Sequence, residues 1–190
     1  MLRDDDSELA TINEAIRLRG LFIHRYSGIE FSVSELIVRA REHPTYRALG
    51  DLPKPWARKV KRLKTLFKMD GPIKAYAADM RSTFEGFRSF ETNRHFLVHA
   101  MMTIPRDAVD RTMLGFSMYD HRPIRDDGES ISVVHAGRLE MNLNALDQFV
   151  ASLQPISTNF TALVARICRE IPLPVLYLRE SVENQTEENP

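Results

Sequence analysis

The chain has 190 residues, 43% of them hydrophobic and 27% charged, and its 26 basic and 26 acidic residues give a formal net charge of zero. This length and composition favour one soluble globular domain, and the neutral charge provides no general attraction to nucleic acid. Cys168 is the single cysteine, which excludes an intrachain disulfide framework and is typical of a reducing compartment. Because we find no signal peptide and no apolar run of membrane-spanning length, we expect a cytoplasmic protein.

A long first helix is predicted from about residue 6 to residue 42, because apolar residues recur there at spacings of three and four. Its apolar stripe consists of Leu9, Ile12, Ile16, Ile23, Tyr26, Val33, Ile37 and Ala40. Two charged residues, Arg19 and Glu30, lie on the same stripe. We expect them to be half-buried charges with polar partners; the alternative is that this face of the helix lines a polar groove.

A proline-containing loop at residues 43–55 precedes a short basic helix at about residues 56–69. The cations of this helix include Lys59, Lys61, Arg62 and Lys64. Most such runs are solvated helix faces, but this one is the best candidate in the chain for a patch that contacts phosphates. After a break at residues 70–72, a third helix is predicted at about residues 73–102, and its apolar stripe also contains Arg94.

Two short segments at residues 113–119 and 130–136 have strand character. Because Pro123, Asp127 and Gly128 lie between them, we expect a β-hairpin with a long loop. The last helix is predicted from Asn142 or Asn144 to Glu170. Its apolar stripe stays in phase across Pro155, which indicates one kinked helix rather than two separate ones.

These elements predict a mainly α fold, an up-and-down bundle of about four main helices with a β-hairpin inserted between the third and the fourth. We assign residues 1–178 to a single domain. Residues 179–190 are acidic and polar, and we expect this tail to be disordered.

The segment Asn93–His99, late in the predicted third helix, carries Arg94, His95 and His99 among apolar residues. An apolar helix seldom contains an arginine and two histidines unless their polar groups have partners. The arginine offers a planar cation that matches a phosphate, and a histidine can take or give a proton near neutral pH. Together, an arginine and a histidine provide the minimum of side-chain chemistry needed to cleave a phosphodiester.

The segment resembles the R-x4-6-H signature of the HEPN superfamily, with Arg94 followed by His95, three residues and then His99. The resemblance implies a helical bundle that forms homodimers, in which the motifs of two subunits share one groove. It also implies a metal-independent endoribonuclease without a cofactor, in which a ribose 2′-hydroxyl attacks the adjacent phosphate.

In this resemblance His99 would be the general base or acid, Arg94 would bind the phosphate, and His95 would orient the pair or donate to the phosphate. We expect Lys59, Lys61, Arg62 and Lys64 to contact the RNA. Relatives of this type often act in toxin–antitoxin or defence systems, so an antitoxin is a possible partner.

Three other interpretations remain open. Glu91, His95 and His99 lie at positions i, i+4 and i+8 and could ligate a metal, although no obvious fourth ligand is close in sequence. The chain could instead be a non-catalytic dimerisation module that binds a partner such as a nucleotidyltransferase. The residues could also be structural, with Arg94 paired to a carboxylate, His99 buried and His95 facing water.

Overall fold

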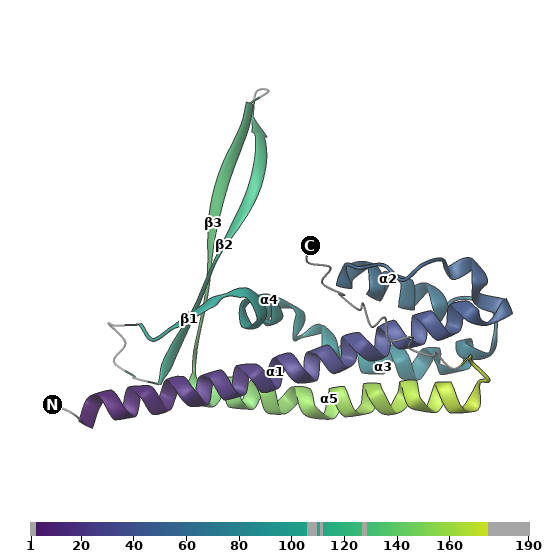
Figure 1. Ribbon diagram of the computed structural model, residues 1–190, viewed down its shortest axis with the longest axis horizontal. Coiled ribbons are helices and arrows are strands. Elements are labelled where there is room, and N and C mark those ends of the chain that lie inside the picture. Colours follow the sequence, from purple (N-terminus) through teal and green to yellow (C-terminus); the bar gives the residue numbers. More distant parts are fainter. Residues whose placement is uncertain (1–2, 106–109, 111, 127–128, 175–190) are drawn as a thin grey trace, which may run out of the picture.

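A computed structural model describes residues 3–105, 110, 112–126 and 129–174 of the chain. This part is mainly helical and contains a small antiparallel sheet of three strands, so the predicted fold class is confirmed at this level. Two long helices, α1 (Arg3–Glu42) and α5 (Leu143–Glu170), lie side by side along the long axis of the molecule (Figure 1). The shorter helices and the sheet lie against this pair.

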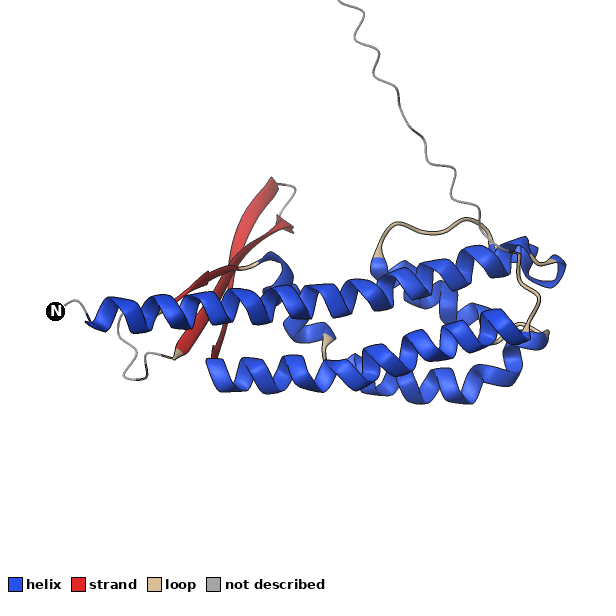
Figure 2. Cartoon of the chain, turned by 60° about the horizontal axis from the view of Figure 1, so that its bottom comes forward, coloured by secondary structure: helices blue, strands red, loops and turns tan. Residues whose placement is uncertain are grey.

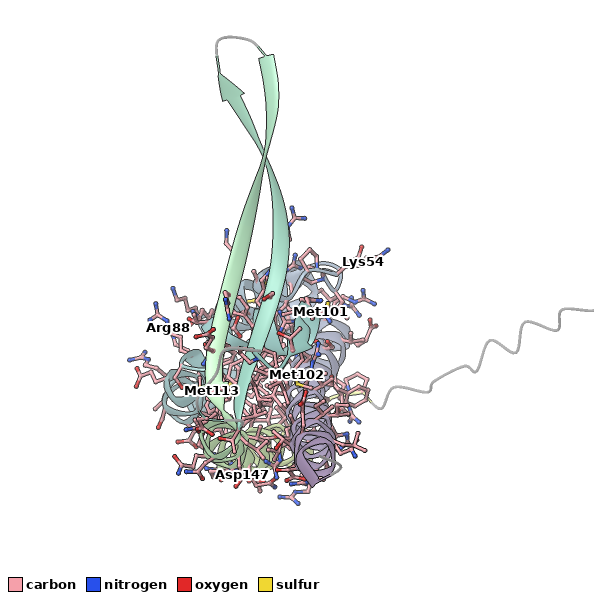
Figure 3. The ribbon with its side chains drawn as sticks, turned by 90° about the vertical axis from the view of Figure 1, so that its left-hand side faces the viewer. Lys54, Arg88, Met101, Met102, Met113 and Asp147 are labelled. Carbon is pink, nitrogen blue, oxygen red and sulfur yellow. The ribbon has the colours of Figure 1, made fainter. Side chains whose placement is uncertain are left out.

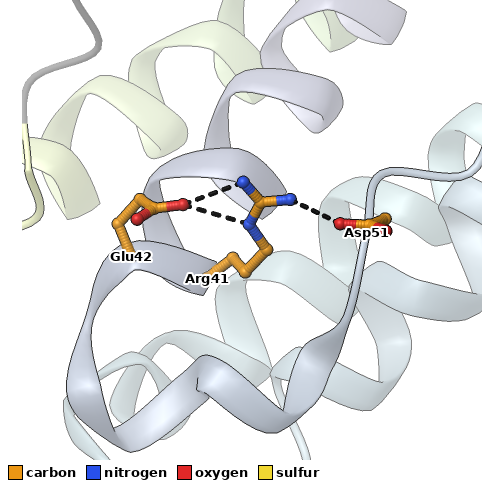
Figure 4. A network of polar contacts seen from close by, with 3 residues as sticks. All are labelled: Arg41, Glu42 and Asp51. Carbon is orange, nitrogen blue, oxygen red and sulfur yellow. Dashed lines mark hydrogen bonds and ion pairs between the residues drawn. The ribbon is translucent and has the colours of Figure 1, made fainter.

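Helix α1 confirms the predicted long first helix and ends at a network around Arg41. The Arg41 guanidinium donates to Asp51 at 2.8 Å and also to Glu42 (Figure 4). These bonds connect the end of the helix to the following loop. The imidazole of His43 accepts a hydrogen bond from the Thr45 amide at 3.3 Å. This contact caps the short 3-10 helix η1 (Pro44–Leu49), so the predicted loop at residues 43–55 is partly helical.

The hydrophobic core is continuous between α1, α5 and the shorter elements, and its largest fully buried side chains include Phe22, Tyr46, Phe87, Phe116 and Phe160. The beginning of the predicted stripe on α1 does not belong to this core. Leu9 and Ile16 are 56% and 55% exposed. The N-terminal part of α1 runs past the start of α5 (Figures 1 and 2), and Ile16 faces away from the core, since its neighbours Ala15 and Leu18 are buried.

Helix α2 (Trp56–Leu66) confirms the predicted short basic helix and turns buried Leu63 and Leu66 toward the core. The following chain is not one helix. Residues 73–102 form the 3-10 helix η2 (Pro72–Tyr76), helix α3 (Ala77–Arg88), helix α4 (Glu91–His99) and strand β1 (Met101–Thr103).

The chain makes a tighter turn between α3 and α4, where the Phe90 amide donates to the Phe87 carbonyl, three residues earlier, at 3.1 Å. Phe87 and Phe90 flank this turn and are both buried, at 1% and 4% exposed. The prediction of a continuous third helix was therefore wrong.

The predicted hairpin exists, but its strands are longer than expected. Strand β2 (Met113–Asp126) pairs with β3 (Glu129–Asn142) along their whole length, and β1 pairs with the beginning of β2. Pro123 lies opposite Ser132 in this ladder, so the prediction that it belongs to a long loop was wrong. A proline is tolerated here because β1 does not extend to this part of β2.

Beyond β1 the two long strands form a ribbon that projects away from the helices (Figures 1 and 2). Met101, Met102 and Met113 lie near its base (Figure 3). Asp127 and Gly128, which the hairpin prediction included, and the predicted acidic tail at residues 179–190 lie outside the described residues.

Helix α5 is continuous across Pro155, as predicted, and Asn142 caps it by accepting a hydrogen bond from the Ala145 amide at 2.8 Å. Five residues before the proline, Arg25 of α1 donates to the Val150 carbonyl at 2.7 Å. This contact joins the two long helices. In the described part of the chain, no helix has the length and apolar character needed to cross a membrane.

Candidate functional site

Helix α4 is fixed against α1 by Arg19. The guanidinium of Arg19 donates to three carbonyl oxygens at the C-terminal end of α4, at 2.6 Å to Leu97, 3.2 Å to Val98 and 2.9 Å to Ala100. The last carbonyls of a helix lack intrahelical partners, and a cation there also interacts favourably with the helix dipole. Arg19 is thus a partnered, half-buried charge, as expected, and it holds the end of α4 that carries His99.

Arg94 is directed toward α1. Its Nη2 donates to Oε1 of Glu30 at 2.9 Å, and its guanidinium carbon lies 4.7 Å from the centre of the Tyr26 ring. The side chains of Arg94 and Glu30 are only 22% and 29% exposed, so this ion pair is partly shielded from solvent. The expectation that Glu30 has a polar partner is confirmed, and that partner belongs to the motif itself.

Glu91, at the start of α4, connects this ion pair to α2. One of its carboxylate oxygens accepts hydrogen bonds from the Tyr26 hydroxyl at 2.5 Å and from the Trp56 indole at 2.9 Å. Burial of Tyr26, together with its hydrogen bond to Glu91, raises the pKa of the Tyr26 hydroxyl above its ordinary value, so the hydroxyl remains a donor at neutral pH. The network therefore joins α1, α2 and α4 beneath the motif.

His95 and His99 lie farther along α4 than Glu91, and both are exposed. Their rings are neighbours, with centroids 5.2 Å apart and planes at 68°. The expectation of a buried His99 is therefore wrong, whereas that of a His95 facing water is met. The ring of Phe96 lies against Gly137 of β3, 3.2 Å from where a side chain would begin, so the sheet also supports α4.

The separation of Arg94 from His99 follows from helical geometry. Five residues correspond to about 140° of rotation, so the two side chains leave the helix in different directions. Within one chain the structure brings His95 together with His99 and brings Arg94 together with Glu30 and Tyr26. It does not place the guanidinium of Arg94 in a cluster with the two imidazoles.

The metal-site interpretation needs Glu91, His95 and His99 to converge on one ion. The carboxylate of Glu91 instead accepts from Tyr26 and Trp56, in the network on the side of α1 and α2. Among the described residues, no group of three or more histidine, cysteine or acidic side chains is placed to hold a metal ion. The geometry gives this interpretation no support.

The basic residues predicted to contact RNA lie on α2, away from the histidines. Lys61 and Lys64 are exposed, and Lys59 and Arg62 are half-buried. The first turn of α2 meets the first turn of α4 through the Trp56–Glu91 hydrogen bond, and the rest of α2 runs beside α3. In Figure 1, α2 and the end of α4 are separated along the long axis. One chain therefore does not combine this patch and the histidine pair in a single cleft.

Sequence reasoning did not identify the contributions of Tyr26 and Trp56 to the network under the motif. From the sequence, Tyr26 was interpreted only as one apolar position in the stripe of the first helix. The useful signal was the pair of charges on that stripe, Arg19 and Glu30, because both bind α4 in the structure. Charges that interrupt an apolar stripe can thus mark the surface where another helix packs, although we did not draw that inference from the sequence.

No protein-family model, no curated protein and no solved structure matches the chain. The site is therefore interpreted from its own geometry. Helix α4 presents two adjacent imidazoles to solvent, while an arginine, two glutamates and two aromatic residues connect it to α1 and α2.

Proposed function

We propose that the chain is a metal-independent endoribonuclease of the HEPN type, with His95 and His99 as its proton-transfer residues. The observation that carries the proposal is the exposed pair of imidazoles, 5.2 Å apart between ring centroids, at the end of a helix that Arg19 fixes. Histidine is the side chain best suited to proton transfer near neutral pH. At this separation both rings can reach the same phosphodiester.

The proposed reaction needs one base and one acid. The base takes the proton of a ribose 2′-hydroxyl as its oxygen attacks the adjacent phosphorus, and the acid gives a proton to the departing 5′-oxygen. The products are a 2′,3′-cyclic phosphate and a 5′-hydroxyl, so atoms and charges balance without water or metal. His99 and His95 supply these two roles.

Arg94 is proposed to bind the phosphate and to stabilise the charge that builds on it. Glu30 contacts only one terminal nitrogen of the guanidinium, and an arginine has five N–H donors. Because Arg94 and His99 leave the helix in different directions, we propose that the complete site forms between two copies of the chain, where the α4 helices of both copies face each other.

Exposed apolar side chains near α4 support such a homodimer. Met101, two residues after His99, is 71% exposed, and Ile16, three residues before Arg19 on α1, is 55% exposed. Exposed apolar side chains near a proposed site are consistent with a protein interface there. We further propose that α1, α2, the α3–α4 segment and α5 correspond to the four helices of the up-and-down bundle expected from the sequence.

The basic residues of α2 (Lys59, Lys61, Arg62 and Lys64) are proposed to bind the RNA backbone at a distance from the cleavage point. Such contacts act through charge rather than base recognition, so their effect falls as salt rises. From the resemblance to HEPN proteins, we propose that the activity belongs to a toxin–antitoxin or defence system, with an antitoxin as the partner.

The 2′-hydroxyl provides a direct test of this chemistry. In the presence of EDTA, the wild-type protein is expected to cut a labelled RNA and to leave 2′,3′-cyclic phosphate ends. A matched RNA with a 2′-deoxyribose at the cut site should resist cleavage at that position only, because the attacking group is missing. Equal cutting of both substrates, or cutting that EDTA abolishes, would contradict the proposal.

One observation favours a second candidate function, a non-catalytic partner-binding module. The charge of Arg94 is already matched by Glu30 within the same chain, and Tyr26 covers the guanidinium. A structural arginine would have these contacts without any role in catalysis. A stable complex with a protein such as a nucleotidyltransferase, combined with no cleavage of diverse RNAs, would favour this candidate.

A further inference from the structure

A groove of about 530 Å³ lies between α2 and α3, on a part of the surface that the proposed catalytic site does not use. Its apolar lining includes Trp56, Val60, Phe67, Met80, Phe84 and Phe87. Trp56, Val60 and Phe84 are only half-buried, so the structure leaves part of this lining uncovered. A groove of this size and apolar character is typical of a binding site.

The rim of this groove is cationic. Lys64 and Lys68 come from α2 and the residues just after it, and Arg81 and Arg88 come from α3. All four are exposed, and Arg88 projects outward from the surface (Figure 3). Two glutamates also line the groove, so its four cations and two carboxylates give a net charge of +2. One of these carboxylates, Glu91, already accepts hydrogen bonds from Tyr26 and Trp56.

The last sixteen residues of the sequence, 175–190, have the complementary composition. They begin with four apolar residues, Val175, Leu176, Tyr177 and Leu178, and continue with Glu180, Glu183, Glu187 and Glu188. Arg179 is the one basic residue among them, so the side chains of the segment carry a net charge of −3. An apolar stretch followed by acidic residues matches a groove with an apolar lining and a cationic rim.

The end of the described chain is close enough for this segment to reach the groove. The hydroxyl of Tyr76 donates to Glu170 at the end of α5, and Ala77, the next residue after Tyr76, already lines the groove. Leu173, 6% exposed, keeps the chain against the core up to this point. Sixteen extended residues span about 50 Å, whereas the twelve residues of α3 span about 18 Å.

We propose that residues 175–190 dock in the groove between α2 and α3 of the same chain. The apolar residues at the beginning of the segment cover the groove lining, and its glutamates lie along the cationic rim. The inference does not rest on the chemistry of RNA cleavage, because none of its steps involves His95 or His99. Of the residues proposed to bind RNA, Lys64 also lies on the rim of the groove.

Trp56 is the only tryptophan in the chain and lines the groove, so quenching of its fluorescence by acrylamide reports whether the groove is covered. The test compares the full-length wild type with a full-length Leu176→Ser/Leu178→Ser variant. The variant should be quenched several-fold more strongly, with unchanged circular dichroism. A matched variant, Asn184→Ser/Gln185→Ser, should behave like the wild type. Equal quenching of wild type and Leu176→Ser/Leu178→Ser would overturn the proposal.

Charge exchange gives an independent check. Lys68→Glu/Arg81→Glu on the rim should increase quenching of Trp56, and adding Glu183→Lys/Glu187→Lys to the same chain should restore protection. Failure of the added changes to restore protection would overturn the proposed contact between segment and rim. Protection of the wild type that disappears on dilution would also overturn it, since it would show that a second copy covers the groove.

Discussion

Replacing His99 with alanine is expected to lower the rate of RNA cleavage by about 100-fold or more, because a positioned acid or base contributes about 10²–10⁴-fold. His99 is exposed and contacts the neighbouring ring of His95, so its loss leaves the hydrophobic core intact. The measurement is the initial rate of cleavage of a labelled RNA with EDTA present, together with the thermal unfolding midpoint. The midpoint should change little.

The matched control for this prediction is His24→Ala. His24 is also exposed, but it lies on α1 and has no part in the pair on α4. Cleavage by this variant should equal that of the wild type. If His99→Ala retains full activity, or if His24→Ala loses as much activity, the assignment of His99 as a proton-transfer residue is wrong.

Replacing Arg19 with methionine is expected to destabilise the fold by about 2–3 kcal/mol, since hydrogen bonds from a charged donor contribute about 1.5–3 kcal/mol and the carbonyls left behind lose their partner. Methionine keeps much of the apolar stem of arginine, so the change mainly removes the three hydrogen bonds to the end of α4. Because these bonds also hold His99 in place, cleavage by the folded variant should be slower than that of the wild type.

Denaturant unfolding of Arg19→Met beside Arg17→Met measures this effect. Arg17 lies two residues away on α1 and, among the described residues, forms a surface ion pair with Glu14 on the same helix, one turn earlier. Such surface pairs contribute little, so Arg17→Met should unfold nearly as the wild type does. A similar small loss in both variants would show that the contacts of Arg19 with α4 do not stabilise the fold.

The elements that could be predicted from sequence are those whose pattern is local and long. The first helix, the short basic helix and the last helix across Pro155 were predicted correctly, because many residues in each repeat the same periodicity. The third helix was predicted to be continuous, yet the chain makes a tighter turn at Phe90 between α3 and α4. Periodicity over residues 73–102 contains no signal for this turn.

The full length of the hairpin could not be predicted from the local sequence either. Strand character was recognised only at residues 113–119 and 130–136, because Pro123 interrupts the intervening pattern. Pairing of β2 with β3 continues past the proline all the same, since one side of β2 has no neighbouring strand there. Whether a strand is at an edge depends on the sheet as a whole, so the local sequence does not reveal it.

At the site, the sequence identified Arg94, His95 and His99 but not what surrounds them. The partner of Arg94 is Glu30, which lies 64 positions earlier in the chain, and only the packing of α4 on α1 brings them together. The anomalous charges of Arg19 and Glu30 on an apolar stripe were the one sequence signal of this contact. The basic patch of α2 had no comparable signal of its position relative to the histidines.

The pH dependence of RNA cleavage tests most directly whether two imidazoles transfer protons in one site. With EDTA present and the pH varied from about 5 to 8, we expect the wild-type rate to follow a bell-shaped profile, because one histidine must be neutral and the other protonated. His95→Ala should lower the rate and remove one limb of the profile. A profile that is flat across this range, one that His95→Ala leaves unchanged in shape and rate, or no cleavage by the wild type at any pH, would contradict the account.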